Sequence, residues 1–315
     1  MVHRAQAPAI RVDRLVRHFG PVRAVDGLSF QVPRGAICGL IGPNGAGKTT
    51  TLRILATLDV ADAGQAQVAG FDALSHPWEV RRRIGFVSET TGVVEHLTVQ
   101  EYLVFLGQCR GLRGQALARE IAFIASAAGI IPLAAQLVSG LSKGQLRRLG
   151  VAGALLGGPT VLLLDEPAAG LDPTARRELR DLLRTLVEQA DLTVLISSHI
   201  LSELQHLVDH LIVVNKGRVA YEGPAEGLGV PDAQARMEIE PAAGTLPQVV
   251  RWLREQPDVS GVTRQGDMVH ALLEAAPEVV LTRAIQAGLT LRQYRVLPQD
   301  LEALYLNAVE QSGGA

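Results

Sequence analysis

The sequence contains little cysteine and no excess of charge of either sign. Only 2 of its 315 residues are cysteines, which excludes a fold built on disulfide bonds and favours a reducing compartment. The 30 Lys and Arg residues are balanced by 32 Asp and Glu, so the strongly basic surface of a nucleic-acid-binding protein is not expected. The first residues lack the apolar core of a signal peptide, and none is expected. A hydrophobic fraction of 47% instead predicts a folded protein with a substantial buried core.

One long stretch, residues 121–142, contains no charged residue. A run of about 20 apolar residues can span a bilayer, but Gly129 and Pro132 interrupt this one. Such a break is typical of a buried helix that ends near the glycine and is followed by a second segment. We therefore expect no transmembrane helix here, and any role at a membrane has to come through another chain.

Buried strands alternate with an amphipathic helix over much of the chain. Apolar runs at residues 36–41, 161–164 and 193–196 predict strands that are covered on both faces. Residues 174–189 predict an amphipathic helix, because their leucines fall on one face. Residues 10–32 alternate polar and apolar side chains, which predicts short antiparallel strands. The expected fold class is α/β, with a mostly parallel sheet and an antiparallel β subdomain.

The pattern changes after Gly223 and Pro224. Residues 236–296 predict the order strand, helix, strand, strand, helix, strand, and residues 300–309 predict a final short helix. This order is typical of a small α+β domain of the ferredoxin-like type. We therefore expect a main domain over residues 9–224 and a second, smaller domain over residues 234–311.

The segment GPNGAGKT, residues 42–49, fits the phosphate-binding loop G-x-x-x-x-G-K-[ST]. It follows a predicted buried strand and precedes a predicted helix over residues 49–58, which makes a chance glycine-rich turn the weaker alternative. Backbone N–H groups of such a loop converge on phosphate oxygens, the lysine reaches the β- and γ-phosphates, and the threonine hydroxyl binds Mg²⁺. The expected nucleotide contacts in this segment are Gly42, Asn44, Gly45, Gly47, Lys48, Thr49 and Thr50.

Two carboxylates, Asp165 and Glu166, follow the apolar run at residues 161–164. A pair at the end of a buried strand can place the first carboxylate on Mg²⁺ and the second beside an attacking water, as a base or an orienting group. Alternatively, acids after a strand cap the next helix. The phosphate-binding loop upstream favours the catalytic interpretation.

The segment LSKGQ, residues 141–145, precedes an apolar and basic stretch with a helical pattern, so Ser142 could be only a helix N-cap. The segment nevertheless resembles the LSGGQ signature of ABC ATPases, with Lys143 at the first glycine position. Other residues agree with that family in order and spacing. His199 matches the switch histidine, and Leu171-Asp172 matches the D-loop. Phe19 matches the aromatic that stacks on adenine.

The resemblance extends over residues 10–223 and implies a P-loop ATPase core of ABC type with a helical subdomain at about residues 90–142. Its cofactors are ATP and Mg²⁺. In this family two subunits pack head to tail, and ATP lies between the phosphate-binding loop of one and the signature of the other. The resemblance assigns catalysis to Lys48, Glu166 and His199, metal binding to Thr49, Asp165 and Glu89, and further nucleotide contacts to Phe19, Ser142, Gly144, Gln145 and Asp172.

Glu89 departs from the family pattern, which usually has glutamine at this position. The family residue contacts Mg²⁺ and passes the state of the nucleotide to the membrane partner. A glutamate can still bind a hard cation through oxygen, and it adds negative charge beside the γ-phosphate. We therefore expect Glu89 to keep the role of a metal ligand.

Two segments are similar to exporters of the ABC-2 class, which includes multidrug and sodium-extrusion types: residues 91–99 and, more loosely, residues 296–305. The resemblance implies a peripheral ATPase on the cytoplasmic face of the membrane. Its partners are an integral membrane permease in a separate chain and a second, identical ATPase subunit, with no nucleic acid.

Two other functions remain open at this point. A soluble ABC ATPase acting on nucleic acid or ribosomes is disfavoured by the single phosphate-binding loop and the lack of heptads or a basic stripe. A regulatory subunit that binds ATP without hydrolysis is disfavoured by the presence of Lys48, Asp165, Glu166 and His199.

Overall fold

The computed structural model describes residues 7–90, 92–190, 192–204, 207–225, 235–242, 244–266, 268–273 and 277–297. Contacts between residues divide the chain into two compact units, with the boundary after Ala225. The helix predicted over residues 300–309 lies outside the described residues, and so does most of the exporter-like segment at residues 296–305.

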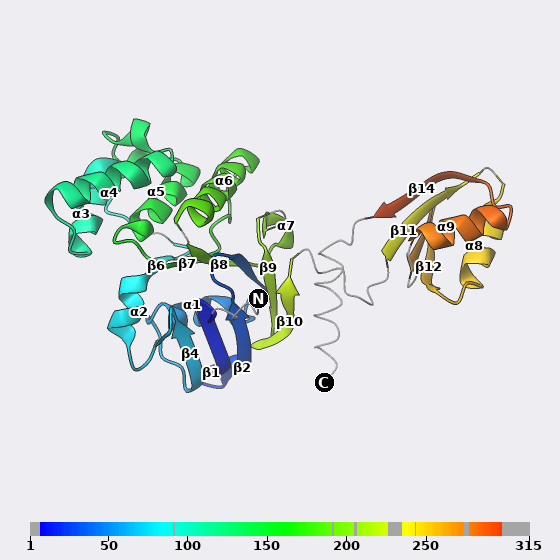
Figure 1. Ribbon diagram of the computed structural model, residues 1–315, viewed down its shortest axis with the longest axis horizontal. Coiled ribbons are helices and arrows are strands. Elements are labelled where there is room, and N and C mark those ends of the chain that lie inside the picture. The colour runs from blue at the N-terminus through cyan, green and yellow to red at the C-terminus, as the bar shows by residue number, and fades with distance from the viewer. Residues whose placement is uncertain are drawn as a thin grey trace, which may run out of the picture. The chain divides into compact units, whose positions relative to one another are not determined.

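A six-stranded sheet lies in the middle of the larger unit, between helices and a second sheet (Figure 1). Its strand order is β10-β9-β3-β8-β7-β6. Its strands are β3 (Ile37–Ile41), β6 (Ile84–Val87), β7 (Val161–Asp165), β8 (Thr193–Ser198), β9 (His210–Asn215) and β10 (Arg218–Pro224). Neighbours are parallel except β10, which runs antiparallel to β9. Every residue of β3, β7 and β8 is buried, which confirms the strands predicted from the three apolar runs.

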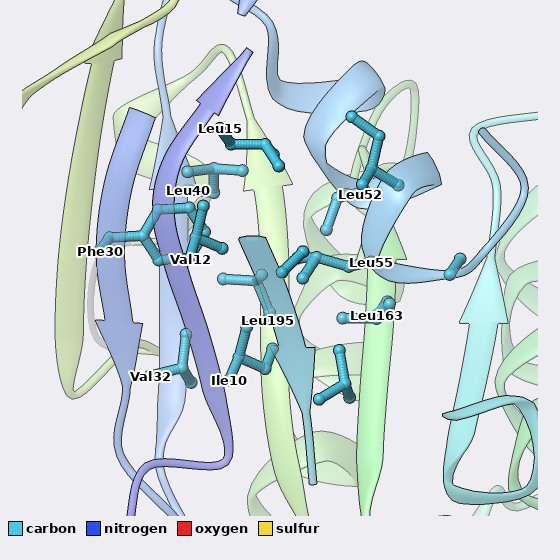
Figure 2. Close-up of a cluster of buried hydrophobic side chains, with 14 of the residues drawn as sticks. Ile10, Val12, Leu15, Phe30, Val32, Leu40, Leu52, Leu55, Leu163 and Leu195 are labelled. Carbon is cyan, nitrogen blue, oxygen red and sulfur yellow. The ribbon is translucent and has the colours of Figure 1, made fainter. Parts of the chain in front are cut away.

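A second, antiparallel sheet with the order β2-β1-β4-β5 packs against the six-stranded sheet. It comprises β1 (Ile10–Phe19), β2 (Val22–Val32), β4 (Ala63–Val68) and β5 (Phe71–Asp72). Figure 2 shows that its side chains, such as Val12 and Phe30, belong to the same cluster as Leu40, Leu163 and Leu195 of the six-stranded sheet. Apolar residues at alternate positions therefore join the two sheets into one core.

The first helix, α1 (Lys48–Leu55), contributes Leu52 and Leu55 to this core (Figure 2). The prediction that this helix continues to residue 58 is wrong. Thr57 has a φ of 59°, a left-handed conformation that an α-helix does not contain, and Leu58 is 53% exposed. The regular spacing of Leu52, Leu55 and Leu58 continues beyond the helix, but only Leu52 and Leu55 face the core.

The remaining helices of this unit lie after β5 and between the later strands. They are α2 (Pro77–Arg83), α3 (Val99–Cys109), α4 (Gly114–Ala127), α5 (Lys143–Leu155), α6 (Pro173–Ala190) and α7 (Leu201–Leu204), with short 3₁₀ turns η1 (Ile131–Leu133) and η2 (Val138–Gly140). Helix α4 ends just before Gly129, whose φ is 62°, and η1 follows, as predicted for the uncharged stretch. In the described part of the chain no helix combines the length and the apolar character needed to cross a membrane.

The smaller unit contains a four-stranded antiparallel sheet with the order β12-β13-β11-β14. Its elements are β11 (Ala235–Pro241), α8 (Leu246–Arg254), β12 (Val259–Gln265), β13 (Met268–Leu273), α9 (Pro277–Gln286) and β14 (Leu291–Leu297). They follow one another in the order predicted from the sequence. A core of its own, which includes Met237, Val249, Leu253 and Val280, joins both helices to the sheet.

We predict that Leu55→Ala lowers the free energy of unfolding of the larger unit by about 2–5 kcal/mol, because it leaves a cavity among fully buried side chains. Leu58→Ala is the matched control, since it removes the same atoms from an exposed position three residues on, and its effect should stay within about 0.5 kcal/mol. Urea denaturation followed by circular dichroism measures both. Equal losses in the two variants would contradict the placement of this helix face.

Candidate active site

The phosphate-binding loop lies between two parts of the chain that are distant in sequence. Gly47 has a φ of 100°, and a Cβ there would come within 2.3 Å of the backbone oxygen of Ala24 in β2. Only glycine can combine this conformation with so close an approach. On another side, the N–H of Gly217, in the turn between β9 and β10, donates to the oxygen of Ala46 at 3.1 Å. The loop is therefore held in place by β2 and by the β9–β10 turn.

Lys48 opens α1 and is buried, with 6% of its surface exposed. Its Nζ donates to the backbone oxygens of Gly42 at 2.8 Å and Pro43 at 3.2 Å, and lies 3.6 Å from Oε1 of Glu166. The ammonium group therefore bridges the start of the loop and the second carboxylate. The flexible lysine chain can exchange carbonyl partners for the oxygens of an entering phosphate.

Asp165 ends β7, and its carboxylate accepts two hydroxyl groups at the same oxygen. Thr49 Oγ1 donates to Oδ1 at 3.1 Å, and Ser197 Oγ donates to Oδ1 at 2.6 Å. The two residues expected to bind Mg²⁺ are thus in direct contact. Within the described residues no cluster of three or more His, Cys, Asp or Glu side chains could hold a metal. One carboxylate and one hydroxyl fit Mg²⁺, which keeps several waters and shares phosphate oxygens instead of filling an all-protein cage.

Glu166 is held in an unusual conformation. Its φ is 47°, which is rare for a residue with a side chain, and only 7% of its surface is exposed. The Glu166 N–H donates to Ser197 Oγ at 3.0 Å, while Oε2 lies 2.9 Å from His199 Nδ1 and accepts the His199 N–H at 3.3 Å. These bonds connect Glu166 to the end of β8. Backbone strain of this kind is frequent at functional sites.

The expected catalytic residues Lys48, Glu166 and His199 therefore converge, together with Thr49 and Asp165. The carboxylates of Asp165 and Glu166 bond to these side chains and to backbone groups. In the described residues neither carboxylate caps the next helix, α6, because a different acid accepts the N–H groups at its start. That acid is Asp172, whose Oδ1 accepts the N–H groups of Thr174 and Ala175 at 2.9 Å each at the start of α6.

The signature segment opens helix α5. Ser142 is its N-cap: Ser142 Oγ accepts the Gln145 N–H at 3.3 Å, and the Gln145 side chain accepts the Ser142 N–H at 2.9 Å. Gly144 packs closely on α6, because a Cβ there would lie 2.8 Å from that of Ala175. The capping role that the sequence left open for Ser142 is thus present. In the described residues no hydrogen bond joins this segment to residues 42–49.

Of the other predicted nucleotide contacts, Phe19, Asn44 and Gly45 lie at the surface, whereas Gly42 is buried. Phe19 ends β1 and is 48% exposed, and the Arg17 guanidinium lies 4.8 Å from the centre of its ring. Arg17 is itself paired with Asp59 at 2.7 Å and Asp62 at 2.9 Å. Asn44 and Gly45 are exposed in the loop, and Thr50 is half-buried in α1.

Glu89 follows β6 and is exposed, so its carboxylate can reach a ligand from the surface. Its backbone oxygen accepts Nη2 of Arg147 at 3.1 Å, and the oxygen of Ser88 accepts Nη1 at 3.0 Å. Burial lowers the pKa of the Arg147 guanidinium from its ordinary value, and the charges of Glu89 and Asp165 oppose that shift. A buried cation therefore lies directly against the segment that carries Glu89.

Two residues of this site were not singled out from the sequence. Ser197 links Asp165 to Glu166, and Arg147 holds the segment of Glu89. A signal for the first exists, because Ser197 is a polar residue at the end of an otherwise apolar strand. No comparable signal marks Arg147, since arginines are ordinary on the exposed face of a helix.

We predict that Ser197→Ala lowers the free energy of unfolding by about 1–3 kcal/mol, because the buried Glu166 N–H and Asp165 carboxylate each lose a partner. Ser75→Ala is the matched control: Ser75 makes the same kind of hydroxyl–carboxylate bond, to Asp72 at 2.8 Å, on an exposed surface. Its effect should stay within about 0.5 kcal/mol. Denaturant unfolding compares the two, and an unchanged stability of Ser197→Ala would refute the bridging role.

Proteins of similar sequence are ATP-binding proteins. The family model described as ABC transporter matches residues 25–169. The chain is 40% identical over 243 residues to the daunorubicin/doxorubicin resistance ATP-binding protein DrrA of Streptomyces peucetius, which covers 74% of this chain and 73% of that protein. It is 34% identical over 307 residues, 95% of each chain, to the daunorubicin resistance ATP-binding protein DrrA3 of Streptomyces coeruleorubidus. With the bacitracin transport ATP-binding protein BcrA of Bacillus licheniformis it shares 37% identity over 219 residues, 70% of this chain and 71% of that one.

A solved structure has the same fold. The ADP conformation of MJ1267, an ATP-binding cassette of an ABC transporter, matches with a TM-score of 0.65 and 26% identity, and the match covers 70% of this chain and 93% of that one. These matches confirm the predicted ABC-type P-loop fold and the resemblance of the chain to ABC transporter ATPases. The chain belongs to the ATP-binding proteins of ABC transporters, a family of ATPases.

Proposed function

We propose that this chain is the ATP-hydrolysing subunit of a two-component exporter, driven by the closure of two such subunits on ATP. The observation that carries the proposal is the convergence of Lys48, Glu166 and His199 at the carboxyl ends of β7 and β8. The names of the relatives support an exporter: two concern daunorubicin resistance, and another is a Nod factor export ATP-binding protein of Ralstonia nicotianae.

In this proposal residues 9–224 form the ATPase domain, with the helical subdomain at about residues 90–142. Residues 234–311 form an accessory domain of the ferredoxin-like type, which the β-α-β-β-α-β order and the strand order of the small unit support. The helical subdomain contacts an integral membrane permease in a separate chain, and the ATPase lies on the cytoplasmic face of the membrane as a peripheral subunit.

The phosphate-binding loop binds the triphosphate. Backbone N–H groups at the start of α1 point toward anions, and Lys48 adds a point charge beside the β- and γ-phosphates. Thr49 and Asp165, directly or through water, hold Mg²⁺, with Glu89 as a further oxygen ligand. When bound, Mg²⁺ neutralises charge on the β- and γ-phosphate oxygens. Phe19 stacks on adenine from the edge of the site, and the other loop residues, from Gly42 to Thr50, line the phosphates.

Glu166 orients the attacking water and accepts its proton. Burial and the two bonds from His199 fix the carboxylate, so little reorganisation is needed when the water binds. A carboxylate can only accept a hydrogen bond, so His199 Nδ1, 2.9 Å from Oε2, donates to Glu166. In this proposal His199 contacts the γ-phosphate and helps to hold Glu166 and the water in line.

The second half of the site comes from an identical subunit. The N-terminus of α5 has the partial positive charge that attracts anions, and Ser142 is exposed at that end. In the dimer Ser142, Gly144 and Gln145 contact the nucleotide held by the partner, and Asp172 lies beside the same interface. One copy alone is then a poor ATPase.

We predict that Glu166→Gln retains ATP binding but lowers kcat by about 10²–10⁴-fold, because the base is removed while the shape of the site is kept. Lys48→Ala is expected to lose ATP binding itself. Nucleotide titration and steady-state phosphate release separate the two effects. Normal turnover by Glu166→Gln would show that the base is another group.

We predict that Lys48→Ala and Ser142→Arg, each inactive alone, recover ATPase activity when they are mixed. Each mixed dimer has one site with both substitutions and one site with neither. Thermal unfolding of Ser142→Arg controls for loss of the helix cap. A mixture that stays inactive, together with a wild-type rate strictly proportional to protein concentration, would refute a site shared between subunits.

A further inference from the structure

Helix α5 and the segment after β6 are joined by one side chain. Arg147, 8% exposed, donates Nη1 to the Ser88 oxygen at 3.0 Å and Nη2 to the Glu89 oxygen at 3.1 Å. We infer that Arg147 is a positioning residue that couples the two nucleotides of the dimer, by tying the segment of Glu89 to the helix that begins at Ser142. The inference rests on the proposed function, in which these two ends meet different nucleotides.

The geometry of the contact suits a rigid link. The planar guanidinium places two N–H groups side by side, and here they meet the carbonyls of two adjacent residues, Ser88 and Glu89. Bonds to backbone oxygens hold the chain itself and not a rotatable side chain. Because the arginine is buried, water competes poorly for these bonds, and breaking them leaves buried polar groups without partners.

Arg147 is also close to the end of its helix. It lies five positions after Ser142, which corresponds to about 7.5 Å along a helix axis. An α-helix of this length moves as a unit, so a displacement of residues 88 and 89 reaches the N-terminus of α5. The guanidinium also bonds the backbone of Glu89 itself, the proposed metal ligand of its own subunit. Arg147 thus lies between the site in its own chain and the surface that the partner's nucleotide meets.

A second arginine offers a comparison within the same fold. Arg110, at the end of α3, donates Nη1 to the Arg81 oxygen at 2.9 Å and Nη2 to the Ile84 oxygen at 3.2 Å. It therefore links the end of α3 to α2 and to the start of β6, also through two backbone carbonyls. Arg110 is more exposed and is not joined to Glu89 or Ser142 by any hydrogen bond in the described residues.

The test uses the full-length protein with Arg147→Met, Arg147→Lys and, as the matched control, Arg110→Met. Arg147→Lys keeps the charge but loses the planar fork, so it tests the link even where the methionine variant folds poorly. For each variant the measurements are the Hill coefficient of ATP hydrolysis, the ATP affinity of dilute protein and the thermal midpoint.

We predict that both Arg147 variants lower the Hill coefficient of ATP hydrolysis to 1. This means that binding at one site no longer raises the affinity of the other, a loss of at least about fivefold in coupling. The ATP affinity of dilute protein should stay within about twofold of wild type. Arg110→Met should keep the wild-type Hill coefficient. A wild-type Hill coefficient in Arg147→Lys, or an equal loss in Arg110→Met, would overturn the inference. If wild-type protein itself hydrolyses ATP without cooperativity, the proposed dimer site fails, and the coupling role fails with it.

Discussion

Two adjacent carboxylates at the end of a buried strand impose the main constraint on this structure. Asp165 and Glu166 are 2% and 7% exposed, and buried carboxylates are tolerated only when donors surround them. Those donors come from two separate parts of the chain: Lys48 and Thr49 at the start of α1, and Ser197 and His199 at the end of β8 and just after it. The need to satisfy two acids thus brings the phosphate-binding loop and the ends of two strands to one point.

The same constraint explains why the parallel order of the sheet matters for chemistry. β3, β7 and β8 are neighbours in the order β3-β8-β7, so the segments after them meet at one edge. The helical region meets this edge through Arg147, which bonds the segment after β6. At this edge a bound nucleotide would meet the ends of strands and helices that are far apart in sequence.

Much of the fold and site could be predicted because the signals are local. The apolar runs of β3, β7 and β8, the glycine-rich loop and the carboxylate pair each lie in one short segment. The extent of α1 could not be predicted, because Leu58 continues the leucine spacing after the backbone has left the helix at Thr57. Ser142 illustrates a second limit, since one side chain caps a helix and still lies exposed at the end where an anion would bind.

The sequence by itself determined the motifs, the buried strands β3, β7 and β8, the order of the elements in the smaller unit and the pairing of chemistry with residue types. Hydrophobic period and glycine placement act over a few residues, so they are readable without a structure. The tertiary structure alone decided that Ser197 bridges the two acids, that Glu166 adopts a positive φ, and that Arg147 bonds Ser88 and Glu89. Those features depend on contacts between residues 31 to 59 positions apart, which packing of the whole unit sets and no local pattern records.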